Sequence, residues 1–250
     1  MIRLQDVHKS FGDTHVLRGV NLELTQGETL VILGRSGTGK SVTLKHIVGL
    51  MKPDSGHIFV DGIDVTSASN EQLQTVRQRV AYLFQTGALV NWLSVRDNVA
   101  LPLAEQRKLS SAEIRERVEE SLQSLSMLEA ADRMPSQISG GMRKRAALAR
   151  VLVAQPKAIL YDEPTAGLDP VMARTVSHLI RDVQSSGDRM ALVVTHDLEL
   201  AFSVATRIGL HYKGELIELA PPDVFKQSKH PVIRAFLDGQ SDLGEEGLNQ

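Results

Sequence analysis

One short run carries residue types that suit the binding of a phosphorylated ligand. In chain order these residues are Gly34, Arg35, Ser36, Gly37, Thr38, Gly39, Lys40 and Ser41. They match the pattern G-x-x-x-x-G-K-[ST], in which glycines let successive backbone N–H groups face phosphate oxygens. The lysine neutralises charge on the β- and γ-phosphates, and the hydroxyl of Ser41 can bind Mg²⁺. The run lies between an apolar segment at 29–33 and a helix-like segment at 41–50, as the motif requires, so we predict a nucleotide site with Mg²⁺.

Two adjacent acids follow a second apolar segment. Residues 158–161 predict a buried strand, and Asp162 and Glu163 come directly after it. Burying two carboxylates is costly unless they are paired or take part in chemistry. We predict that Asp162 holds Mg²⁺ through water and that Glu163 polarises the water that attacks the γ-phosphate. A pair of helix caps is the weaker interpretation, because Pro164 and Gly167 place a loop before the next helical pattern.

A histidine and a glutamine extend this set. A third apolar segment, 190–194, leads to His196, and chemistry in parallel sheets collects at the carboxyl ends of the strands. A single histidine is more often structural than functional. Its expected position beside a lysine and two acids nevertheless favours a role in sensing the γ-phosphate. Gln85 ends the β-like run 82–84 and could reach Mg²⁺ or the attacking water, although it would mean little by itself.

A second glycine-containing segment resembles half of a binding site. Ser139, Gly140 and Gly141 precede a helical pattern with apolar residues at Ala146 and Leu148. The free N–H groups of a helix N-terminus and a serine hydroxyl suit an anion such as phosphate. Glycines also serve as ordinary turn residues, so these three residues alone leave the ligand open.

The remaining pattern predicts the framework that positions these residues. Strand-like and helix-like segments alternate, which predicts a parallel sheet covered on both faces. Capping boxes that begin at Ser69 and Ser110 predict helices over about 70–79 and 111–128. The region 87–154 is mostly helical in pattern, unlike the alternation around it. Further expected elements are strands at 2–7, 20–24 and 56–62 and a helix at 171–185.

The composition narrows the classes of protein. The chain has 250 residues, of which 42% are hydrophobic and 23% charged, as in a soluble globular protein. A formal net charge of −2 argues against a nucleic-acid partner, and the absence of cysteine excludes disulfides and thiolate metal sites. No apolar run approaches the roughly 18–20 residues of a membrane span, and the first residues lack the apolar centre of a secretory signal. We therefore expect a cytoplasmic protein, in which any membrane role would come through a partner.

Six motifs in order resemble the ATP-binding subunits of ABC transporters, over residues 1 to about 238. They are the phosphate-binding loop 34–41, Gln85, the signature Ser139-Gly140-Gly141, the pair Asp162-Glu163, the loop Ala166-Gly167-Leu168-Asp169, and His196. The resemblance implies an α/β fold: a P-loop NTPase (RecA-like) parallel-sheet core, an N-terminal antiparallel β subdomain and a helical ABC-specific subdomain. It places the core at about 1–86 and 155–238, the helical subdomain at about 87–154, and a polar tail at 239–250.

The resemblance also implies how a complete ATP site is assembled. In this family the signature loop of one subunit caps the γ-phosphate held by the P-loop of the other, so two ATP molecules are sandwiched in a head-to-tail dimer. This chain has one P-loop and one signature, and it should pair with a second copy of itself. The loop ending at Asp169 should lie across that contact. An aromatic residue near the N-terminus stacks on adenine in the family, and Phe11 stands where it is expected; a core role is its alternative.

Two positions depart from the family pattern. The signature commonly ends in glutamine, where this chain has Met142. The residue after Ser41 is often threonine or serine, whereas here it is Val42, which cannot bond the α-phosphate. The second change removes one hydrogen bond, on the order of 1 kcal/mol. Neither change removes the lysine, the Mg²⁺ position or the proposed base, so we expect an active ATPase.

One branch of the family is the most similar. The segment ISGGMRKRAALAR at 138–150 is similar to the ATPases of Mla- and MCE-type lipid-trafficking systems, and 34–42, 84–89, 95–99 and 230–239 fit the same branch. The similarity implies an integral-membrane permease, an MCE-domain lipid-binding protein, and phospholipid or another hydrophobic molecule as cargo. The subunit would lie on the inner face of the cell membrane, with 86–99 receiving the permease's coupling helix.

The three basic residues Arg143, Lys144 and Arg145 follow the signature directly. A solvated first turn of a helix is the plain interpretation of such a run. Cations at a helix N-terminus are, however, unfavourable by a few tenths to about 1 kcal/mol. We therefore predict that at least one of them pairs with acids or phosphate at the ATP sandwich or the permease contact.

Several alternatives remain to be weighed. A small-molecule kinase would lack the signature and the pairing of Glu163 with His196. DNA-repair and chromosome-structuring relatives carry long insertions, and translation-factor relatives hold two ATPase units; this chain has neither. An ABC ATPase of another importer, or of a complex that signals to cell-wall enzymes, shares all these motifs and stays open.

Overall fold

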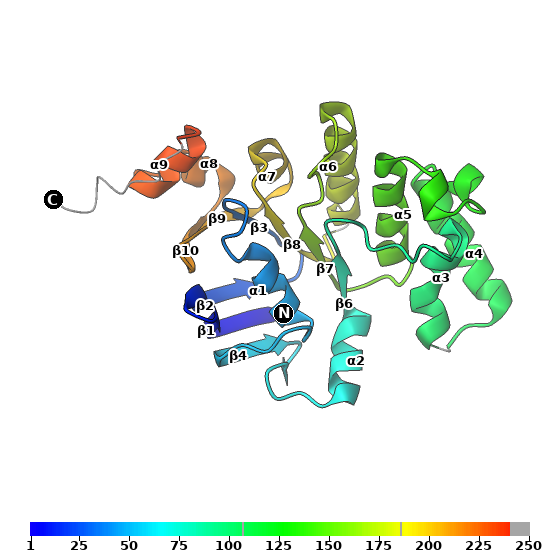
Figure 1. The fold of residues 1–250 in the computed structure, drawn as a ribbon, viewed down its shortest axis with the longest axis horizontal. Coiled ribbons are helices and arrows are strands. Elements are labelled where there is room, and N and C mark those ends of the chain that lie inside the picture. The colour runs from blue at the N-terminus through cyan, green and yellow to red at the C-terminus, as the bar shows by residue number, and fades with distance from the viewer. Residues whose placement is uncertain (107, 186, 241–250) are drawn as a thin grey trace.

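The computed structural model describes residues 1–106, 108–185 and 187–240, and two sheets organise this part of the chain. A six-stranded sheet has the order β10-β9-β3-β8-β7-β6, and a four-stranded sheet has the order β2-β1-β4-β5. In Figure 1 the larger sheet runs through the middle of the molecule, with helices above it and the smaller sheet below. The expected α/β architecture, with a parallel core sheet and an N-terminal antiparallel sheet, is confirmed.

The six-stranded sheet is built from short apolar runs. Its neighbours pair in parallel from β9 to β6, and only β10 is antiparallel to its neighbour. Every residue of β3 and β7 is buried, as expected for a parallel sheet with both faces covered. The strands are β3 (Thr29–Leu33), β6 (Val80–Leu83), β7 (Ala158–Asp162), β8 (Met190–Thr195), β9 (Arg207–Tyr212) and β10 (Glu215–Ala220).

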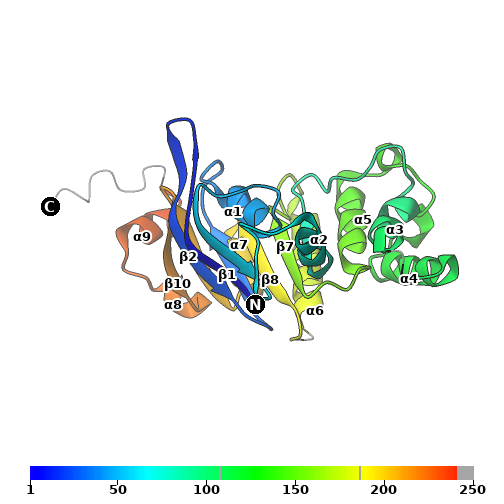
Figure 2. The same ribbon diagram turned by 90° about the horizontal axis from the view of Figure 1, so that it is seen from below.

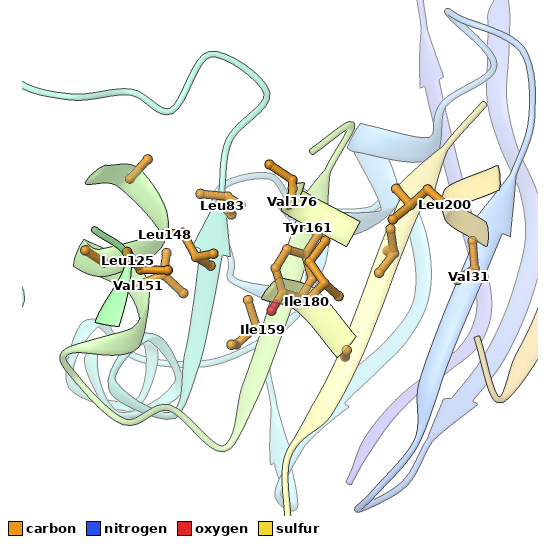
Figure 3. Close-up of a cluster of buried hydrophobic side chains, with 14 of the residues drawn as sticks. Val31, Leu83, Leu125, Leu148, Val151, Ile159, Tyr161, Val176, Ile180 and Leu200 are labelled. Carbon is orange, nitrogen blue, oxygen red and sulfur yellow. The ribbon is translucent and has the colours of Figure 1, made fainter. Parts of the chain in front are cut away.

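Side chains that alternate along these strands feed two separate cores. On one face, Tyr161 packs beside Val176 and Ile180 of α6 (Figure 3). On the other, Leu160 belongs to a core that includes Leu44 of α1 and the apolar residues of the four-stranded sheet. The flanking helices are α1 (Lys40–Ile47), α2 (Asn70–Arg79), α6 (Pro170–Gln184), α7 (Leu198–Val204), α8 (Pro222–Lys226) and α9 (Pro231–Leu237).

The four-stranded sheet is longer than the sequence pattern indicates. The expected segments 2–7 and 20–24 are parts of two long strands that form an antiparallel pair. The pairing shifts register between Leu4 and Val7, where Asp6 has a left-handed backbone, and this irregularity hides the alternation of a regular strand. The strands are β1 (Ile2–Phe11), β2 (Thr14–Leu24), β4 (Ser55–Val60) and β5 (Ile63–Asp64).

Three helices gather beyond β6 in Figure 1, and Figure 2 shows them together at one end of the molecule. The predicted capping boxes at Ser69 and Ser110 are both present, at the starts of α2 and α4. Helix α4 ends at Ser124 rather than near 128, because Ser126 takes a left-handed backbone that turns the chain. The elements are α3 (Val95–Gln106), α4 (Ser111–Ser124), α5 (Gly140–Leu152) and 3₁₀ turns at Leu128–Ala130 and Pro135–Gln137. The exact subdomain limits stay a prediction.

The elements after β8 were not predicted from the sequence. Strands β9 and β10 form a hairpin through Lys213 and Gly214, both with positive φ, and β9 pairs with β3.

The predicted helix at 171–185 is α6, and the helix predicted at 41–50 ends earlier, at Ile47. Of the predicted polar tail, 241–250 lies outside the described residues.

Candidate nucleotide-hydrolysis site

The carboxyl ends of three neighbouring strands bring most of the predicted residues together. Strand β8 lies between β3 and β7, with Leu33 opposite Thr195 and Asp162 opposite Val194. The phosphate-binding loop after β3, the two acids at the end of β7 and the histidine after β8 therefore share one edge of the sheet. This is where ligands bind in open parallel sheets.

The loop from Gly34 to Gly39 can form only because its glycines lack side chains. A Cβ at Gly34 would lie 2.8 Å from the carbonyl oxygen of His211, and one at Gly39 would lie 2.5 Å from Val16 Cγ1. Gly39 also has φ +105°, a conformation that other residues rarely adopt. The backbone thus lies close against β9 and β2, and α1 begins directly after the loop.

Lys40 is held inside the loop. Its exposed fraction is 5%, and its Nζ donates to the carbonyl oxygens of Gly34 (2.7 Å) and Arg35 (2.8 Å). The same Nζ lies 3.3 Å from Glu163 Oε1. Burial lowers the pKa of Lys40, and the neighbouring Glu163 opposes that shift. A cation held among carbonyl oxygens is ready to exchange them for phosphate oxygens.

Asp162 has a donor on each carboxylate oxygen. The hydroxyl of Ser41 donates to Oδ1 at 2.7 Å, and the hydroxyl of Tyr82 donates to Oδ2 at 2.8 Å. Among the described residues no group of three or more His, Cys, Asp or Glu could hold a metal ion. Mg²⁺ takes one or two protein oxygens together with substrate phosphates, and the Ser41 hydroxyl and the Asp162 carboxylate supply oxygens of this kind. Ser41 and Asp162 are therefore suited to hold it, and Mg²⁺ would neutralise charge that develops on the phosphates.

Glu163 is buried beside the histidine. Its Oε2 accepts hydrogen bonds from the Thr195 hydroxyl (3.2 Å) and the His196 backbone N–H (3.4 Å), and it lies 2.9 Å from His196 Nδ1. The imidazole of His196 is half exposed, so it faces the open side of the site. Glu163 has a left-handed backbone with φ +46°, which is strained for a residue with a side chain. This local geometry fixes the carboxylate at the strand end, and Asp169, not the two acids, caps α6.

The signature residues occupy the N-terminus of α5. Ser139 is the N-cap, and its hydroxyl accepts the backbone N–H of Met142 at 3.2 Å. Ser139 and Gly140 are exposed, while Gly141 lies so near α6 that an added Cβ would be 2.6 Å from Met172 Cε. Met142 packs against the core, which accounts for an apolar residue at that position. Within the described residues no hydrogen bond joins these signature residues to the phosphate-binding loop.

The basic run bonds backbone atoms within the chain, and its pairing with acids or phosphate at the ATP sandwich or the permease contact stays a prediction. Arg143, Lys144 and Arg145 each donate to backbone carbonyl oxygens, and in the described chain none forms an ion pair with a carboxylate. Lys144 is the most connected: its Nζ donates to the carbonyl oxygens of Pro164 (2.7 Å), Ala166 (3.0 Å) and Glu163 (3.3 Å). Burial lowers the pKa of Lys144, which Glu163 opposes. Lys144 thereby connects helix α5, which begins at the signature residues, to the loop that follows Glu163.

The remaining predicted residues lie apart from this cluster. Phe11 is 47% exposed at the end of β1, with Lys9 Nζ 5.6 Å from its ring centre. Gln85 is exposed just after β6, and Val42 packs against the core on the α1 side. Asp169 is exposed and caps α6 by accepting the N–H groups of Val171 and Met172. These roles stay predictions.

An open groove of about 1030 Å³ lies between β6, α2, α3 and α5. Arg150 of α5 lines it and donates to the carbonyl oxygens of Gly87 and Ala88 at 2.7 and 2.8 Å. Asn98 is fully buried and bonds both backbone groups of Val90, which stabilises the loop before α3. Side-chain hydrogen bonds thus hold the backbone of the loop beside the groove.

The fold and the strand-edge site define a P-loop nucleotide hydrolase. A family model described as "ABC transporter" matches residues 17–166, and the chain belongs to this family. A dimeric ATP-binding cassette solved in a post-hydrolysis state with ADP and Pi is similar, with a TM-score of 0.82, 32% identity, and coverage of 89% of this chain and 99% of that one. The chain is accordingly an ABC ATPase that uses ATP and Mg²⁺, and its homologues form dimers.

Curated relatives carry names for different cargoes. A probable ribonucleotide transport ATP-binding protein of Mycobacterium leprae is 41% identical over all of this chain and 72% of its own length. The chloroplastic protein TRIGALACTOSYLDIACYLGLYCEROL 3 of Arabidopsis thaliana is 37% identical over 97% of this chain and 74% of its own length. An Fe(3+) ions import ATP-binding protein of Photobacterium profundum is 38% identical over 96% and 67%. Within the described residues no helix is both long and apolar enough to cross a membrane.

Sequence reasoning missed three contributors to the site. Tyr82 was noted only as part of a strand, yet it bonds Asp162. Thr195 bonds Glu163, and His211 lies under the phosphate-binding loop. The alternation of side chains along strands was the available signal for the Tyr82 contact, because it places Tyr82 and Asp162 on the same face of the sheet. Nothing in the local sequence indicates the other two contacts.

Proposed function

We propose that the strand-edge cluster hydrolyses ATP with the following roles. Lys40 neutralises the β- and γ-phosphates, and Ser41 and Asp162 hold Mg²⁺, the latter through water. Glu163 accepts a proton from the attacking water, and His196 senses the γ-phosphate. The convergence of Lys40 and His196 on the same Glu163 carboxylate supports this assignment, because it places a base between the phosphate loop and a polar contact on the open side.

We also propose that two copies complete each other's sites. Exposed Ser139 and Gly140 at the N-terminus of α5 have free N–H groups that suit a phosphate. A head-to-tail partner would bring these groups to the ATP on the phosphate-binding loop, with Asp169 at the contact. Phe11, exposed at the end of a strand, is available to stack on the adenine.

The groove is the proposed docking site for a membrane permease. It is open and lined by apolar residues from α3 together with the charged Arg77 and Arg150, which suits an amphipathic helical segment of a partner. Trp92, in the adjoining loop, is 81% exposed and would add an aromatic contact. Gln85 directly follows Phe84, which lines the groove, and its proposed role is to reach Mg²⁺ or the attacking water. Docking there would hold the subunit at the inner membrane face.

The proposed cargo is a phospholipid or another hydrophobic molecule, delivered with an MCE-domain protein. The observation that carries this choice is the similarity of 138–150 to the lipid-trafficking branch, and the name of the Arabidopsis relative refers to a galactolipid. Relatives named for ribonucleotide and Fe(3+) transport keep a second candidate, the ATPase of another importer, in view. A signalling complex that regulates cell-wall enzymes is the third.

Purification from native membranes tests the proposal directly. The tagged chain would be isolated in mild detergent, and its bound proteins and lipids identified by mass spectrometry. A permease with an MCE-domain protein and enriched phospholipid is the expected result. Recovery of a solute-binding importer, or of a regulator of wall hydrolases, would replace the lipid proposal with the corresponding alternative. The Lys40→Ala variant, purified in parallel, shows whether assembly needs nucleotide.

A further inference from the structure

Tyr82 stands on the face of β6 that leads to the magnesium side of the site. In the parallel pairing of β6 with β7, Tyr82 lies opposite Leu160. Residues two apart on a strand point to the same face, so Asp162 shares the face of Leu160 and Tyr82. The phenol hydroxyl reaches Asp162 Oδ2 at 2.8 Å, which makes it a direct donor to this carboxylate.

The two donors to Asp162 are not equivalent. Ser41, the donor to Oδ1, is itself a proposed Mg²⁺ ligand, so its oxygen is required by the metal. Tyr82 has no such second task in the nucleotide site. The Tyr82 hydroxyl makes its 2.8 Å hydrogen bond to Oδ2, the carboxylate oxygen that Ser41 does not contact. The Tyr82 hydroxyl can therefore keep the carboxylate oriented while the metal is bound.

The same side chain forms part of the groove. Tyr82 and Phe84 both line it, and their rings stack with centroids 4.2 Å apart. A partner segment in the groove would contact these rings. The phenol thus spans from the groove to the Asp162 carboxylate within one residue, without any intervening side chain.

We propose that Tyr82 is a positioning residue that orients Asp162 for Mg²⁺ and makes that orientation respond to occupation of the groove. The inference rests on the proposed role of Asp162 in holding Mg²⁺. A purely structural tyrosine would affect thermal stability alone. A positioning tyrosine affects the affinity for the metal.

The test removes only the hydroxyl. Tyr82→Phe keeps the ring and its stacking, and Tyr161→Phe is the matched control. Tyr161 lies next to Asp162 in the chain but points into the opposite core (Figure 3), so its hydroxyl is remote from the carboxylate. Both changes are introduced into a Glu163→Gln background, in which slow hydrolysis leaves ATP intact. Mn²⁺, which substitutes for Mg²⁺, is titrated with ATP present and followed by electron paramagnetic resonance.

We expect Tyr82→Phe to weaken Mn²⁺ binding about three- to tenfold, which is part of the value of one hydrogen bond to a charged group. Tyr161→Phe should leave the Mn²⁺ affinity unchanged. Equal affinities in Tyr82→Phe and its parent would overturn the positioning role. Ser41→Ala separates the two levels of the proposal: if it too leaves ATP-dependent Mn²⁺ binding intact, the proposed metal site itself is wrong.

A second measurement addresses the groove. The half-saturating Mg²⁺ concentration for ATP hydrolysis is compared between the free subunit and the complex purified with its membrane partner. In the wild-type chain we expect this concentration to differ between the two forms, and in Tyr82→Phe the difference should be lost. A difference of the same size in both chains would refute the link to the groove while leaving the first result standing.

Discussion

The two proposed half-sites of this ATPase are prepared in different ways. At the carboxyl edge of the parallel sheet, Lys40, Asp162 and Glu163 are buried and already joined to one another or to their neighbours by short contacts. At the N-terminus of α5, Ser139 and Gly140 are exposed, and the Ser139 hydroxyl caps its own helix. The first half is organised by the fold of one chain, whereas the second half faces outward.

The difference indicates which step of site assembly requires rearrangement. Preorganised charges at the strand edge need little rearrangement when ATP binds. The outward-facing half becomes useful only when a partner is brought to it, so its contribution depends on association. Lys144 is the exception, because it is rooted in α5 and bonds the loop after Glu163. These hydrogen bonds connect the two half-sites within one chain.

Removing the proposed base at the strand edge should cause the largest loss of ATPase activity. We expect Glu163→Gln to lower kcat about 10²- to 10⁴-fold, the usual contribution of a general base, while ATP binding persists. ATP should then accumulate in a trapped dimer, visible by size-exclusion chromatography with multi-angle light scattering. Turnover near the wild-type rate would remove Glu163 from the mechanism.

Mixing two damaged chains should show whether the halves come from different copies. Lys40→Ala removes the phosphate-binding cation, and Ser139→Arg fills the outward-facing half, so each variant alone should lack most activity. A mixed dimer contains one site built from an intact P-loop and an intact signature. We expect the mixture to regain ATPase activity that neither variant has alone. No regain upon mixing, with mixed dimers verified by mass spectrometry, would argue against shared sites.

Cutting the link between the halves should have an intermediate effect. Lys144→Met removes charge-assisted bonds to three carbonyl oxygens, and we expect kcat to fall about tenfold with an unchanged KM for ATP. Arg145→Met is the control, because Arg145 bonds the Leu125 carbonyl within the helical region. A KM change equal to the kcat change would mean that Lys144 acts on nucleotide binding instead.

Protonation of His211, which lies under the phosphate-binding loop, should lower the free energy of unfolding in mild acid. Burial, assisted by the nearby charge of Lys40, lowers the pKa of His211 to about 4 from 6.5, so the folded state favours the neutral ring. Because the unfolded chain binds this proton first, stability is full above pH 6.5 and declines as pH falls toward 4. The slope is at most about 1.4 kcal/mol per pH unit for this group. Denaturant unfolding of wild type and His211→Leu at several pH values measures it, and identical pH slopes would contradict the assignment.

The parts of the site that a short stretch of chain determines were predictable. The spacing of glycines, lysine and serine identifies the phosphate-binding loop, and an apolar strand that ends in two acids identifies Asp162 and Glu163. The capping boxes likewise predicted the starts of α2 and α4. Each of these features depends on residues a few positions apart, whose interactions are the same in any fold.

Contacts between distant segments were not predictable in the same way. The bond from Lys144 to the loop after Glu163 depends on how the fold places α5 beside that loop, and a basic run gives no sign of it. The hairpin of β9 and β10 was missed because its strands are mixed in polarity, and β9 is completed by pairing with β3. Tertiary placement decides these features, and local pattern does not encode it.

The left-handed backbone of Glu163 has a consequence for how this protein can change. A residue with a Cβ at φ +46° sacrifices roughly 1 kcal/mol of folding stability, which a glycine would recover. Glycine would also remove the carboxylate that pairs with buried Lys40 and accepts hydrogen bonds from Thr195 and His196, and losing these contacts costs more than the strain. The contacts of the carboxylate therefore maintain the strained backbone, and the same contacts hold the proposed base in place.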